Sequence, residues 1–141
     1  KDARKHLSEG GSIIIFPSGT VSTTLKFYQH ADKAFDCEWK KFTSRLIKQT
    51  NPKIVPIYFY GQNSILFHLA SHISDMLRAS LIFNEVRRRI GTEVKFRVGK
   101  PFYYSDLEGD LSNQDLANFL RSETYLLNPE ISVPPPYGLD V

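Results

Sequence analysis

The chain has 141 residues, of which 41% are hydrophobic and 23% charged, so it can bury the core of one domain. Its formal net charge of +3 is too small to indicate nucleic-acid binding, although it suits contact with an anionic surface such as a membrane. The single cysteine, Cys37, excludes an internal disulfide, and no apolar run reaches the length of a membrane span or forms a signal peptide. A reducing, cytoplasmic setting is therefore expected.

The first third of the chain predicts two helices and a strand. Residues 1–9 have the pattern of the last turns of a helix that is closed by Gly10. Residues 12–16 are a short apolar run, typical of a strand buried on both faces, and residues 17–37 are irregular. A helix is predicted over 37–50, with four apolar side chains on one face: Trp39, Phe42, Leu46 and Ile47.

Strands and helices alternate in the middle of the chain. A strand is predicted over 53–61, and its Pro56 favours an edge position or a bulge. A helical stretch over 64–91 follows, and then a strand with alternating polarity over 93–102. The helical stretch carries a stripe of apolar side chains at helical spacing: Leu66, Leu69, Ile73, Leu77 and Leu81.

The last predicted helix covers residues 111–127, with Ser112 as its N-cap. Strands that alternate with helices indicate an α/β fold, with a largely parallel or mixed sheet flanked by helices. We therefore predict one domain over residues 1–127, followed by a Pro-rich tail over 128–141 that is extended or loose.

The loop after the first predicted strand is the strongest candidate for a binding site. A strand that runs into Pro-Ser-Gly-Thr exposes N–H groups and hydroxyls at the carboxyl edge of a sheet, where open α/β sheets bind ligands. Gly19 permits close approach of a ligand, and the hydroxyls of Ser18, Thr20 and Ser22 can donate to phosphate or carboxyl oxygens. An ordinary turn after a strand is the alternative. The chain has neither a Walker lysine nor a G-x-G-x-x-G pattern, which disfavours nucleotide binding.

Several segments resemble one enzyme family in the correct order. GGSIIIFPSGTVS looks like the third motif of the glycerolipid acyltransferases of the lysophosphatidic-acid type, commonly Phe-Pro-Glu-Gly-Thr-Arg-Ser. The later segments are similar to the bacterial hemolysin branch, which is close to the ornithine-lipid acyltransferases and carries D-x-x-W, a Val-Pro strand and Gly-x-Asn-Ser-x-x-Phe. The resemblance extends over nearly the whole chain up to the tail, and its motifs lie at residues 10–22, 36–39, 55–57, 61–67, 94–102 and 119–127.

This resemblance implies a glycerol-phosphate acyltransferase-like fold whose N-terminal part is missing here. It implies an O-acyltransferase of membrane lipid synthesis, which moves a fatty acyl group from an acyl carrier protein or coenzyme A thioester to a hydroxyl of a lyso-lipid. Neither a cofactor nor a metal is expected, and the enzyme would lie on the inner face of the cell membrane. The resemblance assigns substrate binding to nine residues: Phe16, Pro17, Ser18, Gly19, Thr20, Val21, Ser22, Val55 and Pro56.

Two departures from the family pattern bear on the acceptor. Ser18 stands where the family has glutamate, and Val21 stands where it has arginine. In the branch that forms phosphatidic acid, this arginine is expected to help hold the phosphate of the acceptor. Its loss weakens the case for a glycerol-phosphate acceptor, whereas a small residue at the glutamate position suits the hemolysin and ornithine-lipid branch.

The family's catalytic His-x4-Asp motif, in which histidine is the general base, does not occur in the 141 residues. None of the four histidines is followed by aspartate at the required spacing: His6, His30, His68 and His72. In the family the motif precedes the Phe-Pro-x-Gly segment, so we expect it upstream of Lys1. A chain that begins within a predicted helix and has Met76 as its only methionine agrees with this expectation. The segment alone is then predicted to be inactive.

Three other features carry alternative interpretations. His68, His72 and Asp75 have the spacing of a helical metal site, but the polar face of an amphipathic helix is the preferred explanation, because no third strong ligand accompanies them. We take Cys37 as incidental, because reactive cysteines need nearby positive charge and this one lies between two acidic residues. The run Arg87–Arg89 suits a solvated helix end, anionic lipid headgroups or an acidic acyl carrier protein.

Two functions from other classes stay open. One is a non-catalytic module that binds lipid or a membrane surface, if the protein has no His-x4-Asp motif at all. The other is a small Rossmann-like ligand-binding domain, for which the family likeness is chance. An incomplete domain should expose apolar surface and associate, whereas a complete small domain should fold by itself.

Overall fold

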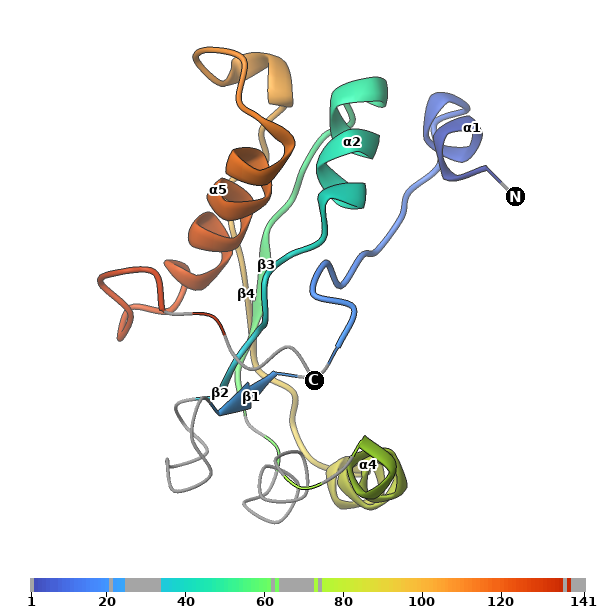
Figure 1. Ribbon diagram of the computed structural model, residues 1–141, viewed down its shortest axis with the longest axis vertical. Coiled ribbons are helices and arrows are strands. Elements are labelled where there is room, and N and C mark those ends of the chain that lie inside the picture. Colours follow the sequence, from blue (N-terminus) through green and yellow to red (C-terminus); the bar gives the residue numbers. More distant parts are fainter. Residues whose placement is uncertain are drawn as a thin grey trace. The chain divides into compact units, whose positions relative to one another are not determined.

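The computed structural model describes residues 2–20, 22–24, 34–61, 63, 73, 75–135 and 137. These residues form four α-helices, one short 3-10 helix and two small sheets, a mixed α/β arrangement (Figure 1). The chain divides into two compact units, each of which is described by itself. The first comprises Lys1–Gly19, Trp39–Tyr58 and Arg97–Pro134, and the second comprises Thr20–Glu38, Phe59–Phe96 and Pro135–Val141.

Two helices of the first unit begin at side chains that cap them. The helix α1 (Ala3–Ser8) confirms the helix predicted at the start of the chain, and the Asp2 carboxylate accepts from the N–H of Arg4 over 3.0 Å. The helix α5 (Asn113–Tyr125) begins at Ser112, whose hydroxyl accepts from the N–H of Asp115 over 3.1 Å. Ser112 is therefore the N-cap that the sequence predicts, because its side chain satisfies an N–H that has no partner within the helix.

The helix α2 (Lys41–Thr50) begins four residues later than the sequence predicts and ends at Asn51. Asn51 takes a left-handed conformation with φ of 39°, and its N–H donates to the carbonyl oxygen of Ile47 over 2.8 Å. Its amide side chain makes two bonds to Ser105, one donated to the hydroxyl over 3.1 Å and one accepted from the N–H over 3.2 Å. Asn51 thus closes the helix and fixes the segment that precedes α5.

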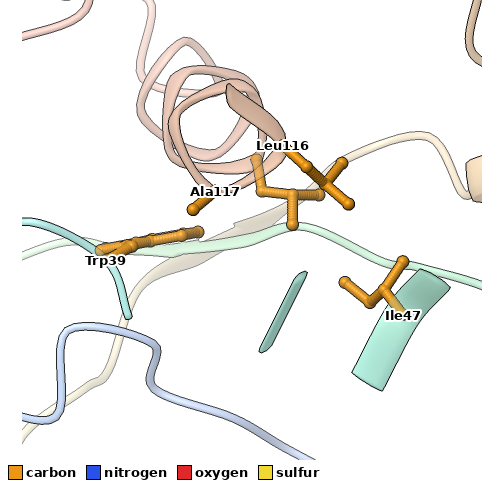
Figure 2. Close-up of a cluster of buried hydrophobic side chains, with 5 residues drawn as sticks. Trp39, Ile47, Leu116 and Ala117 are labelled. Carbon is orange, nitrogen blue, oxygen red and sulfur yellow. The ribbon is translucent and has the colours of Figure 1, made fainter. Parts of the chain in front are cut away.

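The hydrophobic core of the first unit lies between α2 and α5, which are neighbours in space (Figure 1). Figure 2 shows Trp39 and Ala117 beside each other below α5. Of the four apolar residues that the sequence places on one face, Trp39, Leu46 and Ile47 are buried, and Trp39 and Ile47 belong to this core. Phe42 is 62% exposed, because the buried side chains of α2 lie on a different arc of the helix. The buried cluster has five members: Trp39, Ile47, Leu116, Ala117 and Leu120.

The loop before α5 is fastened to α2 by a charged contact. The amine of Lys48 donates to the Asp110 carboxylate over 2.8 Å and to the carbonyl oxygen of Leu111, and it lies 5.3 Å from the ring centroid of Tyr104. The Tyr104 hydroxyl donates to the same carboxylate over 3.0 Å. Hydrogen bonding to Lys48 lowers the pKa of Asp110, and the same bond raises the pKa of Lys48.

Both sheets are antiparallel and two-stranded, which corrects the prediction of a largely parallel or mixed sheet. The strand β1 (Thr23–Thr24) pairs with β2 (Ala34–Phe35), with Thr23 opposite Phe35. The strands β3 (Ile57–Phe59) and β4 (Phe96–Val98) form the second sheet. The antiparallel bridge between Ile54 and Phe102 continues this ladder. A helical connection between two strands does not force them to be parallel, and alternation alone misled the prediction.

The apolar run 12–16 is not a strand, which is a second correction. Ile13, Ile14 and Phe16 are 37%, 83% and 72% exposed. A buried strand needs neighbours that take up its backbone N–H and carbonyl groups, and the composition of a run says nothing about those neighbours. The alternation expected in β4 is also absent, because all three of its residues are exposed.

The helix α4 (Asp75–Arg89) corresponds to the second half of the helical stretch predicted over 64–91. It ends close to Gly91, whose φ of 79° suits a helix stop. Leu66 and Leu69 of the predicted stripe lie outside the described residues. Ile73 is 69% exposed, because it lies in a turn before the helix begins and so falls off the helical spacing.

Candidate functional site

A β-turn forms the first part of the predicted binding loop. The N–H of Gly19 donates to the carbonyl oxygen of Phe16 over 3.1 Å, with Pro17 at the second position, where its fixed φ is favoured. The carbonyl oxygen of Pro17 accepts from the N–H of Lys40 over 2.9 Å. Ser18, at the third position, is only 3% exposed. The turn is therefore held by its own backbone bond and by the segment that leads into α2.

The backbone at Gly19 is open on one side. Its φ is 71°, a conformation that favours glycine, and a Cβ built there meets no other atom within 4 Å. Phe16 is 72% exposed at the start of the same turn. Together they offer an accessible peptide group next to an exposed aromatic ring, which suits a ligand with both polar and apolar parts.

The second part of the loop is joined to the segment that contains Asp36 and Cys37. The Ser22 hydroxyl donates to the Asp36 carboxylate over 2.5 Å, and the Thr20 hydroxyl lies 3.3 Å from the Cys37 sulfur. The pairing of β1 with β2 continues directly from these contacts. The structure thus brings together two sequence segments that are fourteen or more residues apart, whereas Val21 lies outside the described residues.

Val55 and Pro56 have different neighbours. Pro56 is buried just before β3, and its carbonyl oxygen accepts from the N–H of Gly99 over 2.9 Å. A Cβ on Gly99 would lie 3.1 Å from a methyl carbon of Leu127, so this packing leaves little room for a side chain there. Val55 is 41% exposed. Pro56 therefore lies just before the strand and not inside it as the sequence predicts, and Val55 supplies exposed apolar surface.

A shallow hollow in the first unit was not predicted. It encloses about 350 Å³, and its two aromatic rings, Phe102 and Phe119, meet edge to face with centroids 6.0 Å apart. These rings come from two segments, 94–102 and 119–127, that the family resemblance already singles out, but sixteen intervening residues hide their proximity. Cationic, acidic and apolar side chains share its lining: Lys100, Pro101, Phe102, Asp106, Phe119 and Glu123.

The histidines supply no general base in the described part of the chain. His6 lies 3.2 Å, through Nε2, from the carbonyl oxygen of Ser12, and its ring covers the position that a Cβ on Gly11 would take. The other three histidines, and the side chain of Asp75, lie outside the description. Among the residues that are described, no three His, Cys, Asp or Glu side chains gather as metal ligands would.

The chemistry available at this loop is binding through hydroxyls and backbone groups. The Ser22 hydroxyl already donates its proton to Asp36, so this pair holds the two segments together. Cys37 is 1% exposed, which agrees with the interpretation that it is not a nucleophile. The exposed peptide at Gly19 is the group best placed to approach a carbonyl or phosphate oxygen.

No family model, no curated protein and no solved structure matches this chain. Within the described segments, no helix has the length and apolar character needed to cross a membrane.

Proposed function

We propose that this chain forms the substrate-binding part of an O-acyltransferase, which moves a fatty acyl group from an acyl carrier protein or coenzyme A thioester to a hydroxyl of a lyso-lipid. One observation carries the proposal. Residues of the loop 16–22 and of the segment 36–39, which the family resemblance selects independently, are bonded through Ser22 and Asp36 and through Thr20 and Cys37. These contacts would hold the two segments together as one binding site.

Two further pairs of selected segments meet in the same way. Pro56, from the Val-Pro strand, is hydrogen-bonded to Gly99, and Phe102 packs against Phe119. The proposal rests on these contacts together with the family resemblance of the segments that make them.

The proposed roles follow from exposure and chemistry. The accessible peptide at Gly19 would lie near the reacting carbonyl, and Phe16 and Val55, both exposed, would contact the acyl chain or the lipid. In the reaction the acceptor oxygen attacks the thioester carbonyl, a general base takes the hydroxyl proton, and the thiol leaves. No histidine of this chain has the His-x4-Asp spacing, so the proposal assigns binding to this chain and proton transfer to residues upstream of Lys1.

This assignment places the protein at the inner face of the cell membrane, where its lipid acceptor would lie. The acceptor would be a lyso-lipid without a glycerol phosphate, because Val21 stands at the position of the family's arginine. The donor is left as either thioester, since both carry the same reacting carbonyl.

The test is an acyl-transfer assay on this chain and on a form extended upstream in its own gene, with labelled acyl carrier protein and coenzyme A thioesters and a panel of lyso-lipids. We expect transfer only by the longer form, and loss of transfer when an upstream histidine is changed. Absence of transfer despite that histidine would favour the non-catalytic lipid-binding module. Activity of the short chain alone would show that the general base is assigned wrongly.

A matched pair of glycines tests the role of the loop. Gly19 and Gly109 both have positive φ, of 71° and 80°, and both face open space where a Cβ would lie. Alanine should therefore impose a similar backbone strain at either site. We expect Gly19→Ala to lower the rate of acyl transfer by the longer form by about tenfold or more. A small displacement of the reacting groups lowers the rate strongly. Gly109→Ala should leave transfer unchanged, and equal loss in both variants would refute the assignment.

A further inference from the structure

The hollow beside Phe102 and Phe119 lies in the first unit, where three segments of the chain meet. One is the extended segment 100–102, which follows β4 and runs beside α5 (Figure 1). The second is the short 3-10 helix Tyr104–Asp106, and the third is α5 itself. The volume of about 350 Å³ falls at the lower end of the range for sites that bind small molecules. The hollow is therefore large enough for a ligand of the size of an amino acid.

The walls of this hollow are held in place by contacts outside it. The N–H of Phe102 donates to the carbonyl oxygen of Ile54 over 3.1 Å, and its carbonyl oxygen accepts from the N–H of Ile54 over 2.8 Å. The Asp106 carboxylate accepts from the N–H of Tyr103 over 2.8 Å, which fixes the 3-10 helix. Phe102 and Phe119 both pack against the buried core cluster. The site is thus formed before a ligand arrives, as small-molecule sites usually are.

Side chains of opposite charge line the hollow without pairing. Lys100, Asp106 and Glu123 all contribute to its lining and are exposed. Within the described part of the chain, no ion pair joins Lys100 to either carboxylate. Glu123 lies one turn after Phe119 on α5, so its carboxylate and this ring stand on the same side of the helix. The hollow therefore offers a cation and two anions beside apolar surface.

We propose that this hollow binds a small zwitterion that carries an apolar ring, such as a free aromatic amino acid. The amine of the ligand would contact Asp106 and Glu123, and its carboxylate would contact Lys100. Its ring would lie against Phe102 and Phe119, which have the geometry of an aromatic pair already. In an α-amino acid the two charged groups are adjacent, so one ligand can bridge protein charges that are too far apart to pair directly.

The mixed lining selects this class of ligand over simpler ones. A ligand with an amine alone would bring a second cation to Lys100, and a ligand with a carboxylate alone would meet two like charges. A ligand without the ring would leave the aromatic surface in water. The proposal goes beyond acyl transfer and does not depend on it.

The experiment is a titration of the full chain, labelled with nitrogen-15, in which amide chemical shifts are followed as phenylalanine or one of three analogues is added. Alanine lacks the ring, phenethylamine lacks the carboxylate, and 3-phenylpropionate lacks the amine. We expect phenylalanine to shift the amides of Phe102 and Glu123 with a dissociation constant of about 1 mM, in line with a ligand of this size. Each analogue should bind at least about threefold more weakly, because it loses one of the three contacts.

Matched variants test the charged side chains. Lys100→Gln and Glu123→Gln should each weaken the binding of phenylalanine about threefold, since contacts between exposed charges are modest. Lys41→Gln and Glu38→Gln make the same changes of charge at exposed positions that do not line the hollow, and they should bind phenylalanine as the wild type does. Absence of any shift with phenylalanine would overturn the proposal, as would equal binding by all four variants. Phenethylamine that binds as tightly as phenylalanine would refute the zwitterionic ligand, because Lys100 would then contribute nothing.

Discussion

The helices α5 and α4 have similar lengths and both carry apolar residues at helical spacing, yet their apolar side chains have opposite fates. In α5, Leu116 and Leu120 are 0% and 5% exposed, whereas in α4, Phe83 and Val86 are 78% and 59% exposed. Periodicity states which side chains share a face of a helix. Whether that face is buried depends on what the rest of the chain places opposite it, and this is the difference between the two helices.

The buried face of α5 has well-defined partners. Trp39 and Ile47 lie against it, and the loop before it is fixed to α2 through Lys48 and Asp110. Among the described side chains of α4 the buried one is Glu85, a residue type that seldom fills a core. The core of the described protein is therefore concentrated around α5, and substitutions in the two helices should differ in their effect on stability.

The largest expected effect is at Leu116. Leu116→Ala should lower the free energy of unfolding by about 2–5 kcal/mol, because it leaves a cavity in a packed cluster. Phe83→Ala in α4 should change it by no more than about 0.5 kcal/mol, as for other exposed positions. Denaturant unfolding would be followed by far-UV circular dichroism and by the fluorescence of Trp39, the only tryptophan and a member of the cluster. Equal losses of stability in both variants would contradict the expected difference between α5 and α4.

The next effect is at the helix ends. Asn51→Ala removes two bonds to Ser105 and puts alanine in a left-handed conformation, so it should cost about 1–2 kcal/mol. Asn51→Gly loses the same bonds but avoids the strain, so it should be less harmful. Gly91→Ala introduces the strain alone at the end of α4. The Trp39 transition should shift for Asn51→Ala and not for Gly91→Ala, if the two regions differ as described.

A smaller effect is expected at the N-cap of α5. Ser112→Ala should lower the free energy of unfolding by about 1 kcal/mol, because the N–H of Asp115 loses its acceptor. Ser112→Thr retains a hydroxyl and should restore most of the stability. Ser132→Ala, outside the helices, is the control. A Ser112→Ala protein as stable as the wild type would mean that the cap contributes nothing to the buried helix.

The smallest effect is expected at the Lys48–Asp110 pair, because the Asp110 side chain is 91% exposed. The bond to Lys48 lowers the pKa of Asp110 in the folded protein, so its stabilisation is complete above the ordinary carboxyl value of 3.8 and is lost as pH falls through the folded pKa. Asp110→Asn should therefore lower the melting temperature slightly at neutral pH, and the two proteins should converge well below pH 3.8. Glu108→Gln makes the same change of charge and is the control. It should leave the melting temperature at neutral pH unchanged.

Local signals in the sequence predicted the helices well. Ser112 and Gly91 mark helix ends by a mechanism that acts within a few residues, so the helix around each could be placed. The same local signals do not predict which strands pair with each other. The run 12–16 has strand composition, but Ile14 is exposed and the run is not a strand, since pairing depends on residues far along the chain. The antiparallel pairing of β3 with β4 was missed for the same reason.

The sequence predicted which residues form the candidate site, but not how their side chains are arranged. Its hydroxyls and Gly19 could be selected from the sequence, because small polar residues after an apolar run are a local pattern. The bond from Ser22 to Asp36 could not, because a hydroxyl can pair with any acceptor that the fold brings near. The hollow beside Phe102 depends likewise on contacts between distant segments.

The burial of Cys37 has a consequence for how the two units can be compared. It is the only thiol of the chain, is 1% exposed, and lies in the second unit, whereas Trp39, two residues later, belongs to the first. A thiol reagent can reach this sulfur only when the surrounding segment opens, so its labelling rate measures the opening free energy of that segment in the unmodified protein. Set beside the unfolding seen at Trp39, the rate would tell whether the chain opens in one step or in two.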